Sequence, residues 1–489
     1  MNANSIPDFF LKYMIGPVVS AVISLISVPI LTRIMQPSEY GKGMMYVTII
    51  NLLFCLCNCG TDQAFVRFYY ESKTQIEKTK LLYSCLAITL ICLILLFFIL
   101  YFFQQKVIVF FFGEPSISLF YIVFFGTLVF VINRFMLLSI RMQQKAFLYS
   151  FCQIFNNFLY FTSLLFLIFI TKYICNFKLI IYAQIFSLYV TFFILLLYER
   201  KKWSLYHLHG AFLKKKQIEK IFYYSWPFIF SFVLIWAFQS IDRIFILKWS
   251  NYTELGIYSA AFSLAAPMML LQTIFTTMWS PIANKNLIEN PDHAKKLFCD
   301  VFRVMFFILI VSAILVVTSK GIFVCLLGAK YRSAIDVFVW LLFVPLFYLL
   351  SEITIAGIII TKKSKWSIHI AAASLLTNLI GCYFLIPHFG AKGAAISLAI
   401  SYLFLFVTRT IISFSYYTFF VNWLNVVIIL VLLTVFISIS YYVSSFIINL
   451  CIGGATLFCV ALLSRNEIKY IFGYLKPRAI RVFCGHKMG

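Results

Sequence analysis

The sequence predicts an all-α polytopic membrane protein, and its bulk composition is the first reason. Of its 489 residues, 63% are hydrophobic and 11% are charged, and the mean hydropathy is +0.97. Soluble domains contain about 45–50% apolar and about 25% charged residues. A soluble fold of this composition could not cover its surface with polar groups, whereas lipid tails can face Leu, Ile and Phe without that penalty.

Long apolar runs are the second reason. A helix needs about 17–25 apolar residues to cross the hydrocarbon core of a bilayer, and runs of this length recur along the chain. We expect about 14 spans, roughly at 13–32, 44–60, 81–103, 117–138, 147–171, 178–198, 221–247, 255–281, 304–320, 334–361, 366–387, 393–415, 422–443 and 445–463. The last two are separated by a break near Ser444 and Ser445, and twelve spans is the alternative count.

The distribution of basic residues predicts the orientation. The chain carries 40 Lys and Arg against 16 Asp and Glu, a net charge of +24. These basic residues lie mostly between apolar segments. With the N-terminus in the cytoplasm, inside segments hold 28 of them and outside segments hold 10. Cytoplasmic loops carry an excess of Lys and Arg, so we expect both termini to be cytoplasmic.

Cysteines predict neither a disulfide framework nor a metal site. Thirteen are scattered through apolar stretches. Cys55, Cys57 and Cys59 lie close in sequence, but on a helix the middle side chain points away from the other two. Buried hydrophobic roles fit these residues better, and we expect no metal or other cofactor.

An internal repeat appears when the chain is compared with itself at an offset of 215 residues. Ser38-Glu39-Tyr40-Gly41 falls on Thr253-Glu254-Leu255-Gly256, and Gly113 falls on Gly328. Ser38 and Thr253 suit helix N-caps, with the acid in the first turn. An offset of six spans keeps the same orientation, so the repeat is a parallel one about an axis along the membrane normal.

The repeat predicts the domain organisation. We expect a six-helix lobe at 1–198, a basic linker at 199–220, a second six-helix lobe at 221–420, two extra spans at 421–463 and a basic tail at 464–489. Two six-helix bundles with a path between them are typical of a rocking carrier.

Short motifs then give a resemblance to a known family. They are Pro29-Ile30-Leu31-Thr32-Arg33, Glu39-Tyr40-Gly41, Asp62, Arg67-Phe68-Tyr69, Asp242-Arg243, Gly256-Ile257-Tyr258-Ser259-Ala260-Ala261, Trp279-Ser280-Pro281, Asn378, Pro387, Gly390 and Gly393-Ala394-Ala395. In this order they resemble the polysaccharide-export flippases, the Wzx-like translocases of O-antigen and capsule repeat units. The resemblance covers about residues 12–415, and the chain departs from it in its 57 Phe and 29 Tyr.

The resemblance implies the fold of the multidrug/oligosaccharidyl-lipid/polysaccharide exporter superfamily, with two six-helix lobes in a V and two extra helices. It implies a polyprenyl-diphosphate-linked oligosaccharide as substrate, flipped from the inner to the outer leaflet of a bacterial inner membrane. A polysaccharide polymerase and the chain-length machinery are the expected partners beside membrane lipids, and no nucleic acid is expected.

Ionisable residues inside spans are the candidates for the translocation path, because each costs roughly 2.5–3.5 kcal/mol at the centre of a span. Arg134, Arg141 and Lys145 fall within about 40° of one another on one face of a helix. They form a cationic stripe that could guide a diphosphate, since guanidinium binds phosphate as a bidentate fork. Arg141 and Lys145 could instead only anchor the helix end.

Five further residues complete the list. Asp242 and Arg243 share one span and could lock it to a neighbour or bind a coupling cation or the headgroup. Glu352 is the other deep carboxylate and could pair with Arg134. Asp62 and Arg67 lie at the cytoplasmic end of a span and are candidates for a gate or a helix cap.

Other functions stay open beside the flippase. A drug or small-molecule antiporter of the same superfamily would require a carboxylate-rich lobe. A membrane glycosyltransferase or polymerase would require long outer loops, and no outer connection here exceeds about 15 residues. A scramblase or structural membrane protein fits the composition too. We expect a transporter and not an enzyme, with proton or sodium coupling left open.

Overall fold

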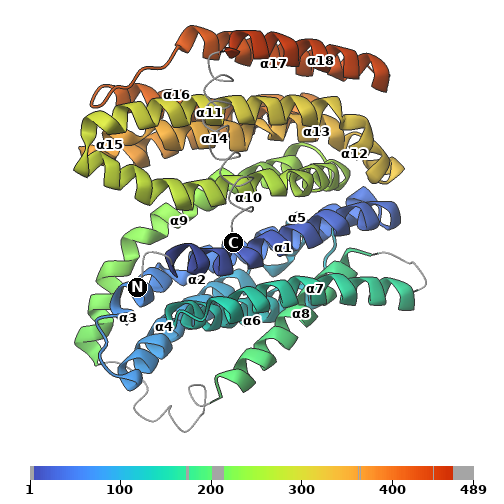
Figure 1. Cartoon of the computed structure of the whole chain (residues 1–489). Helices are drawn as coiled ribbons and strands as arrows, with labels where there is room; N and C mark the ends of the chain where they lie inside the picture. Colours follow the sequence, from blue (N-terminus) through green and yellow to red (C-terminus); the bar gives the residue numbers. More distant parts are fainter. Residues whose placement is uncertain are drawn as a thin grey trace, which may run out of the picture. The chain divides into compact units, whose positions relative to one another are not determined.

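The computed structural model is helical throughout the described residues, which are 5–171, 176–200, 214–361, 363, 365–443 and 445–465. The helices of the first half are α1 (Ser5–Ile34), α2 (Pro37–Asn58), α3 (Thr61–Tyr69), α4 (Gln75–Tyr101), α5 (Gln104–Phe112), α6 (Ile117–Met142), α7 (Ala146–Ile170) and α8 (Phe177–Tyr198). Those of the second half are α9 (Lys215–Trp249), α10 (Tyr252–Glu289), α11 (Pro291–Thr318), α12 (Lys320–Leu326), η2 (Ala329–Tyr331), α13 (Ala334–Leu341), α14 (Phe343–Thr354), α15 (Ala356–Ile360), α16 (Lys365–Phe414), α17 (Trp423–Tyr442) and α18 (Phe446–Leu463). Figure 1 shows their course.

The prediction of about 14 spans is confirmed. Thirteen helices of the described chain are long and apolar enough to cross a membrane. One of these, α16, has 50 residues and consists of two helices joined at Gly390, where φ is 53°. The predicted break near Ser444 falls between α17 and α18.

Contacts divide the chain into two compact units. The first comprises Met1–Leu270, Gly328–Tyr331 and Asn378–Ala394. Within it, α7 packs along α1 and α8, while α2 packs against α8 and α9. In Figure 1, α6, α7 and α8 are neighbours in this unit.

The second unit comprises Leu271–Leu327, Arg332–Thr377 and Ala395–Gly489. Here α11 packs against α14, α17 and α18. Asn449 of α18 donates from Nδ2 to the Val317 and Thr318 carbonyls at 3.0 and 3.1 Å. These bonds attach the last two spans to α11, because the carbonyls at a helix end lack partners of their own.

Two matching hydrogen bonds in the first unit follow the sequence repeat. Glu39, in the first turn of α2, accepts from the backbone N–H of Phe177 at 2.8 Å. Glu254, in the first turn of α10, accepts from the backbone N–H of Ala391 at 2.8 Å. Each carboxylate therefore binds the first free N–H of another helix segment, where the helix dipole favours an anion. Glu254 follows Glu39 by the 215-residue offset of the sequence repeat, and Ala391 follows Phe177 by nearly the same number of residues.

The capping roles predicted for Ser38 and Thr253 are wrong. Both residues lie inside the first turn, because α2 already starts at Pro37 and α10 at Tyr252. Proline suits the first helical position, where its missing N–H costs nothing. Asn251 caps α10 instead, accepting from the Glu254 N–H at 2.9 Å.

The two repeats differ in whether their second helix is interrupted. The chain breaks between α2 and α3 at Cys59 and Gly60, with φ of 50° and 72°, whereas α10 runs on for 38 residues. Glycine adopts such a left-handed conformation without penalty. This break places α3, and Asp62 on it, beside the C-terminal end of α2.

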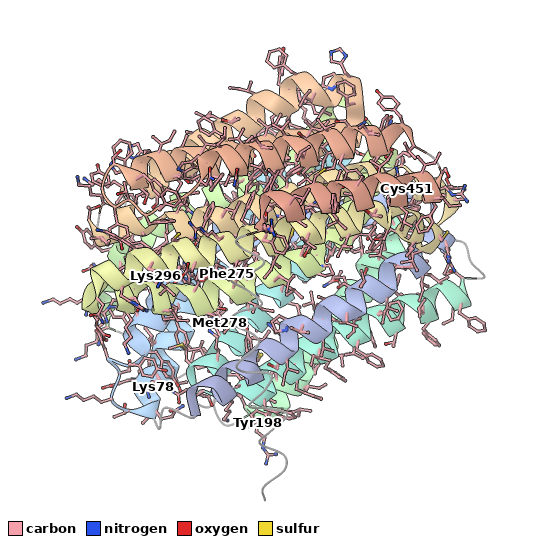
Figure 2. All side chains as sticks on the ribbon, turned by 45° about the horizontal axis from the view of Figure 1, so that its top comes forward. Lys78, Tyr198, Phe275, Met278, Lys296 and Cys451 are labelled. Atoms are coloured by element: carbon pink, nitrogen blue, oxygen red, sulfur yellow. The ribbon has the colours of Figure 1, made fainter. Side chains whose placement is uncertain are left out.

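Apolar side chains cover the outside of the helices (Figure 2). Phe98 of α4, Phe166 of α7 and Leu450 of α18 are more than half exposed, as are many others on these helices. An apolar surface of this extent is stable only against lipid. The chain is therefore a multi-pass membrane protein.

The predicted division into lobes at 1–198 and 221–420 stays a prediction, and so do the extra spans as a separate domain at 421–463. The basic linker predicted at 199–220 falls largely on 201–213, outside the described residues. The same holds for most of the basic tail predicted at 464–489.

One close approach in the first unit gives a stability prediction. Gly256 of α10 lies directly on the Pro37 backbone, and a β-carbon there would overlap the Pro37 carbonyl. Gly256→Ala should lower the free energy of unfolding by about 1–3 kcal/mol, which is the usual cost of overpacking. Gly454→Ala is the matched control, because no atom lies within 4 Å of a β-carbon there. Thermal unfolding of the purified protein measures both, and equal midpoints would contradict the packing described here.

Candidate functional site

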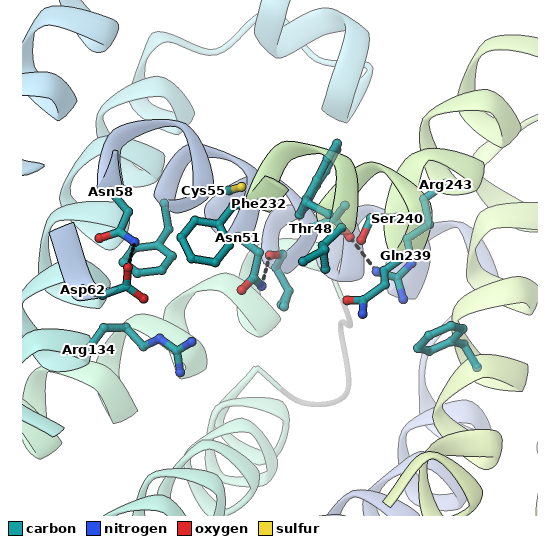
Figure 3. Close-up of a pocket in the computed structure, with 15 residues that line it drawn as sticks. Thr48, Asn51, Cys55, Asn58, Asp62, Arg134, Phe232, Gln239, Ser240 and Arg243 are labelled. Carbon is teal, nitrogen blue, oxygen red and sulfur yellow. Dashed lines mark hydrogen bonds between the residues drawn. The ribbon is translucent and has the colours of Figure 1, made fainter. Parts of the chain in front are cut away.

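A cavity of about 410 Å³ lies inside the first unit, between α2 and α9 (Figure 3). Helices α3, α6 and α10 each contribute one lining residue. The polar lining residues are Thr48, Asn51, Asn58, Asp62, Arg134, Gln239, Ser240 and Arg243. Such a set is unusual inside apolar helices, because each polar group costs free energy unless water, a partner or a ligand satisfies it.

Helical spacing brings these residues to one cavity. On α2, Thr48, Asn51, Cys55 and Asn58 follow one another at three or four residues, so they form one stripe. A second stripe on α9 runs from Phe232 through Trp236, Gln239 and Ser240 to Arg243. The two stripes are the two main walls of the cavity.

Arg134 enters the cavity from α6. It is exposed there, and within the described chain it makes no hydrogen bond or ion pair. Its guanidinium lies 5.5 Å from the Phe54 ring centre and 5.8 Å from that of Phe130. Cation–π contacts hold a guanidinium in place without using its N–H donors. All five donors of Arg134 are thus available for a ligand.

Arg243 is the second guanidinium of the cavity. It donates from Nη1 to the Thr48 hydroxyl at 3.2 Å and lies 4.8 Å from the Phe262 ring centre. Figure 3 shows Arg134 and Arg243 toward opposite ends of the cavity, with Asn51 and Gln239 between them. The sequence indicated both arginines but not that they share one cavity.

Asp62 is the one carboxylate among the described lining residues. Its Oδ1 accepts from Asn58 Nδ2 at 2.7 Å and from the Gln63 N–H at 2.8 Å. These neutral donors hold the carboxylate at the start of α3, where the helix dipole stabilises it. Arg67, the other gate candidate, is exposed and pairs with Glu71 at 3.4 Å. Their role as a gate stays a prediction.

A smaller cavity of about 130 Å³ adjoins the first and shares Phe54, Asp62 and Arg134 with it. Arg141 lines this second cavity, so two members of the predicted cationic stripe follow one another along α6. Lys145 lies just before α7 and donates to the Tyr198 hydroxyl at 3.3 Å. It lines neither cavity, which matches the alternative that it only anchors a helix end.

Asp242 is not among the residues that line the cavity, although its neighbour Arg243 is. Its side chain is fully buried, and the Tyr258 hydroxyl donates to it. Tyr258 lies on α10, so this bond joins α9 to α10. The geometry matches the predicted role of Asp242 in locking its span to a neighbour.

Glu352 lies in the second unit and has a partner there. Arg409 donates from Nη1 to Glu352 Oε1 at 2.7 Å and to the Ser351 hydroxyl at 2.9 Å. The two side chains are 13% and 20% exposed. This pair, between α14 and α16, was missed at the sequence level because Arg409 lies 57 residues from Glu352. The predicted pairing of Glu352 with Arg134 is not found in the described chain, because Glu352 pairs with Arg409 and Arg134 makes no ion pair.

The structure adds cavity residues that the sequence did not indicate, chiefly Asn51, Asn58 and Ser240. An isolated amide in an apolar helix carries no charge and gives a weak signal. Their regular spacing with Thr48 on α2 and with Gln239 and Arg243 on α9 could have revealed them.

A polar, cationic cavity among membrane-spanning helices is an arrangement that transporters use to bind their substrates. The model of the polysaccharide biosynthesis protein family matches residues 10–287, which is more than half of the chain. The chain therefore belongs to this family.

Individual proteins are similar to this chain in sequence or in fold. The Lsg locus putative protein 1 of Haemophilus influenzae is 24% identical over 341 residues, which are 65% of this chain and 76% of that protein. The lipid II flippase MurJ, in an inward closed conformation, has a similar fold with a TM-score of 0.67 at 16% identity, covering 95% of this chain and 99% of MurJ. An inward-facing multidrug resistance MATE transporter has a TM-score of 0.57 at 12% identity, covering 83% and 97%. At these identities the solved structures show the fold alone.

The Glu352–Arg409 pair gives a test that separates a structural role from a role in transport. Removing one partner of a buried ion pair leaves an uncompensated charge and costs about 3–5 kcal/mol. Arg409→Gln should therefore destabilise the protein strongly, and Glu352→Gln combined with Arg409→Gln should recover a large part of the loss. Thermal unfolding of the purified variants measures this. Additive losses in the double variant would show that the two side chains do not act as a pair.

Proposed function

We propose that this protein flips a polyprenyl-diphosphate-linked oligosaccharide repeat unit from the inner to the outer leaflet of a bacterial inner membrane. The family and the fold shared with a lipid II flippase and a MATE transporter support the transporter class. The chemistry of the cavity lining supports the proposed substrate. This part of the proposal depends on Arg134.

The unpaired guanidinium of Arg134 is the observation that carries the proposal. An Arg in an apolar span is costly unless it meets water or an anion. Arg134 faces an open cavity with its donors unused, and Arg243 adds a second positive charge to the same cavity. A diphosphate offers several anionic oxygens, which guanidinium groups bind in bidentate fashion.

Neutral polar groups between the arginines support a glycan-bearing ligand. Asn51 and Gln239 are amides, and an amide can both donate and accept hydrogen bonds. Phe54, Phe232, Trp236 and Phe262 supply apolar ring faces in the same cavity. Sugar rings present hydroxyls around an apolar face, so this lining complements them.

A drug antiporter is the alternative within the superfamily, and the charge of the cavity disfavours it. Such a carrier would bind cations through carboxylates. Asp62 is the one acid among the described lining residues, and it already accepts hydrogen bonds from Asn58 and Gln63. The balance of two arginines against one acid favours an anionic substrate. The proposal therefore makes the protein a carrier and not an enzyme.

The proposal includes the setting of the protein. Both termini face the cytoplasm, as the Lys and Arg distribution predicts, and a reporter active only outside the cytoplasm should be silent when fused after Gly489.

A polysaccharide polymerase and chain-length machinery would receive the flipped product. Coupling to a proton or a sodium ion stays open, with Asp242 as the buried carboxylate on which it would act.

Substitution of Arg134 tests the proposal. Arg134→Ala should abolish or greatly reduce surface glycan while the amount of protein in the membrane is unchanged, because charge-assisted hydrogen bonds of about 1.5–3 kcal/mol each are lost. Arg134→Lys should restore glycan only in part, since an ammonium lacks the planar fork. Glycan display and membrane abundance are measured together in cells that lack the native protein.

The two readouts distinguish binding from folding. If Arg134 only stabilised the helix bundle, the Ala variant would lose protein and glycan together. Normal glycan display from a well-expressed Arg134→Ala variant would contradict the proposed role in phosphate binding.

A further inference from the structure

A third cavity of about 260 Å³ lies on the other side of Arg134, among α1, α6, α7 and α8 of the first unit. We call it the amide chamber. Its polar lining residues besides Arg134 are Ser20, Asn133, Gln153, Asn156, Asn157 and Thr191. No function described above uses this chamber, although four of these six side chains are amides in apolar helices.

The sequence places these amides on matching helix faces. Gln153, Asn156 and Asn157 follow one another on α7 at the spacing of a single face. On α6, Asn133 stands beside Arg134, and Phe130 precedes them by one turn. Four apolar helices therefore turn their few polar side chains toward one common space.

Hydrogen bonds within the wall hold several of these groups in place. Asn133 is 3% exposed and donates to the Leu188 carbonyl at 2.9 Å. Thr191 donates to Asn156 Oδ1 at 3.3 Å, which orients the Asn156 amide. Gln153 donates to the Tyr149 hydroxyl at 3.1 Å.

The wall nevertheless has more hydrogen-bonding capacity than the described chain satisfies. Asn157 makes no hydrogen bond within the described residues, and Nδ2 of Asn156 likewise has no acceptor there. Asn133 Oδ1, Gln153 Oε1 and Ser20 Oγ also lack a partner, but they are fully buried in the wall. Unpaired polar groups away from bulk water cost about 1–3 kcal/mol each, and the free groups of Asn156 and Asn157 are the ones that an occupant of the chamber would satisfy.

The charge of the lining defines the chemical class of that occupant. Arg134 is the one charged side chain among the described residues that line the chamber, and it lies at the boundary with the main cavity. The remaining groups are neutral, and amides offer donors and acceptors side by side. Adjacent hydroxyls of a sugar match this pattern, and the Phe130 ring supplies an apolar face.

We propose that the amide chamber binds the sugar nearest the diphosphate of the lipid-linked glycan. This inference rests on the proposed function, because it takes Arg134 as the diphosphate ligand. In such a lipid the first sugar is bonded directly to the diphosphate. A sugar site must therefore adjoin the phosphate site, and the amide chamber shares Arg134 with the main cavity.

Water alone is the competing occupant. A cavity of about 260 Å³ is large enough to hold several water molecules. A hydrated chamber would satisfy the same polar atoms but would not distinguish a lipid that carries sugar from one that does not. The test therefore compares two lipids that differ only in the glycan.

The experiment measures the affinity of the purified full-length protein, in lipid nanodiscs, for two probes. The first is undecaprenyl diphosphate, and the second is the lipid-linked glycan extracted from cells that lack this protein. Asn157→Leu and Asn156→Leu remove amides while keeping side-chain size. Thr162→Val is the matched control on α7, since that hydroxyl bonds only to carbonyls of its own helix and does not line the chamber.

Asn157→Leu and Asn156→Leu should each weaken binding of the lipid-linked glycan roughly two- to tenfold, as expected for one or two neutral hydrogen bonds. Binding of undecaprenyl diphosphate should be unchanged in both, and Thr162→Val should bind both probes like the native protein. Arg134→Ala, in contrast, should weaken both probes. Thermal unfolding of each variant verifies that it is folded.

Three outcomes would overturn the inference. Unchanged affinity of both Asn variants for the glycan lipid would mean that the chamber holds only water. Equal weakening of both probes would mean that the amides act on the fold and not on the sugar. If the native protein bound neither probe, the proposed function itself would be wrong. The first two outcomes would contradict only the role of the amide chamber.

Discussion

Arg134 is a permanent positive charge on a helix that is otherwise almost entirely apolar, and the polar interior of the first unit is arranged around it. Its aromatic neighbours, Phe54 and Phe130, hold the guanidinium without pairing it. A charge in this position is stable only where water or an anion can reach it. The three cavities that meet at Arg134 supply that access, and α2, α7 and α9 contribute polar residues to their walls at helical spacing.

Three carboxylates that do not line these cavities have a different role. Asp242 is bonded to Tyr258, Glu352 to Arg409, and Glu39 to the N-terminus of α8. Each of these carboxylates joins two helices and so stabilises the fold. Arg134 instead has no polar partner within the described chain and faces the cavities.

Much of the fold could be predicted from the sequence, because the signals involved are strong. Apolar runs defined the spans, and the similar strings at Glu39 and Glu254 led to two equivalent helix-capping contacts. Helix starts were less predictable, since α2 begins at Pro37 with Gln36 at its N-cap position, and Asn251 rather than Thr253 caps α10. The short helices α3, α5 and α12 were missed because each has fewer than ten residues.

The site could be predicted only where it carries charge. Arg134, Arg141 and Arg243 were identified because an ionised group in an apolar span is conspicuous. Asn51, Asn58 and the amides of α7 were not, since a neutral side chain changes the hydropathy of a span very little. The partner of Glu352 was also out of reach, because a contact between residues far apart in the chain leaves no local pattern.

Transbilayer movement of the lipid itself is the most direct measure of the central claim. The purified protein is reconstituted into proteoliposomes that carry the extracted lipid-linked glycan in both leaflets, and a glycan-cleaving enzyme that cannot cross the bilayer is added outside. The account predicts that the inner-leaflet pool becomes accessible and is cleaved in vesicles containing the protein. Cleavage that stops at the outer-leaflet pool, as in protein-free vesicles, would contradict it.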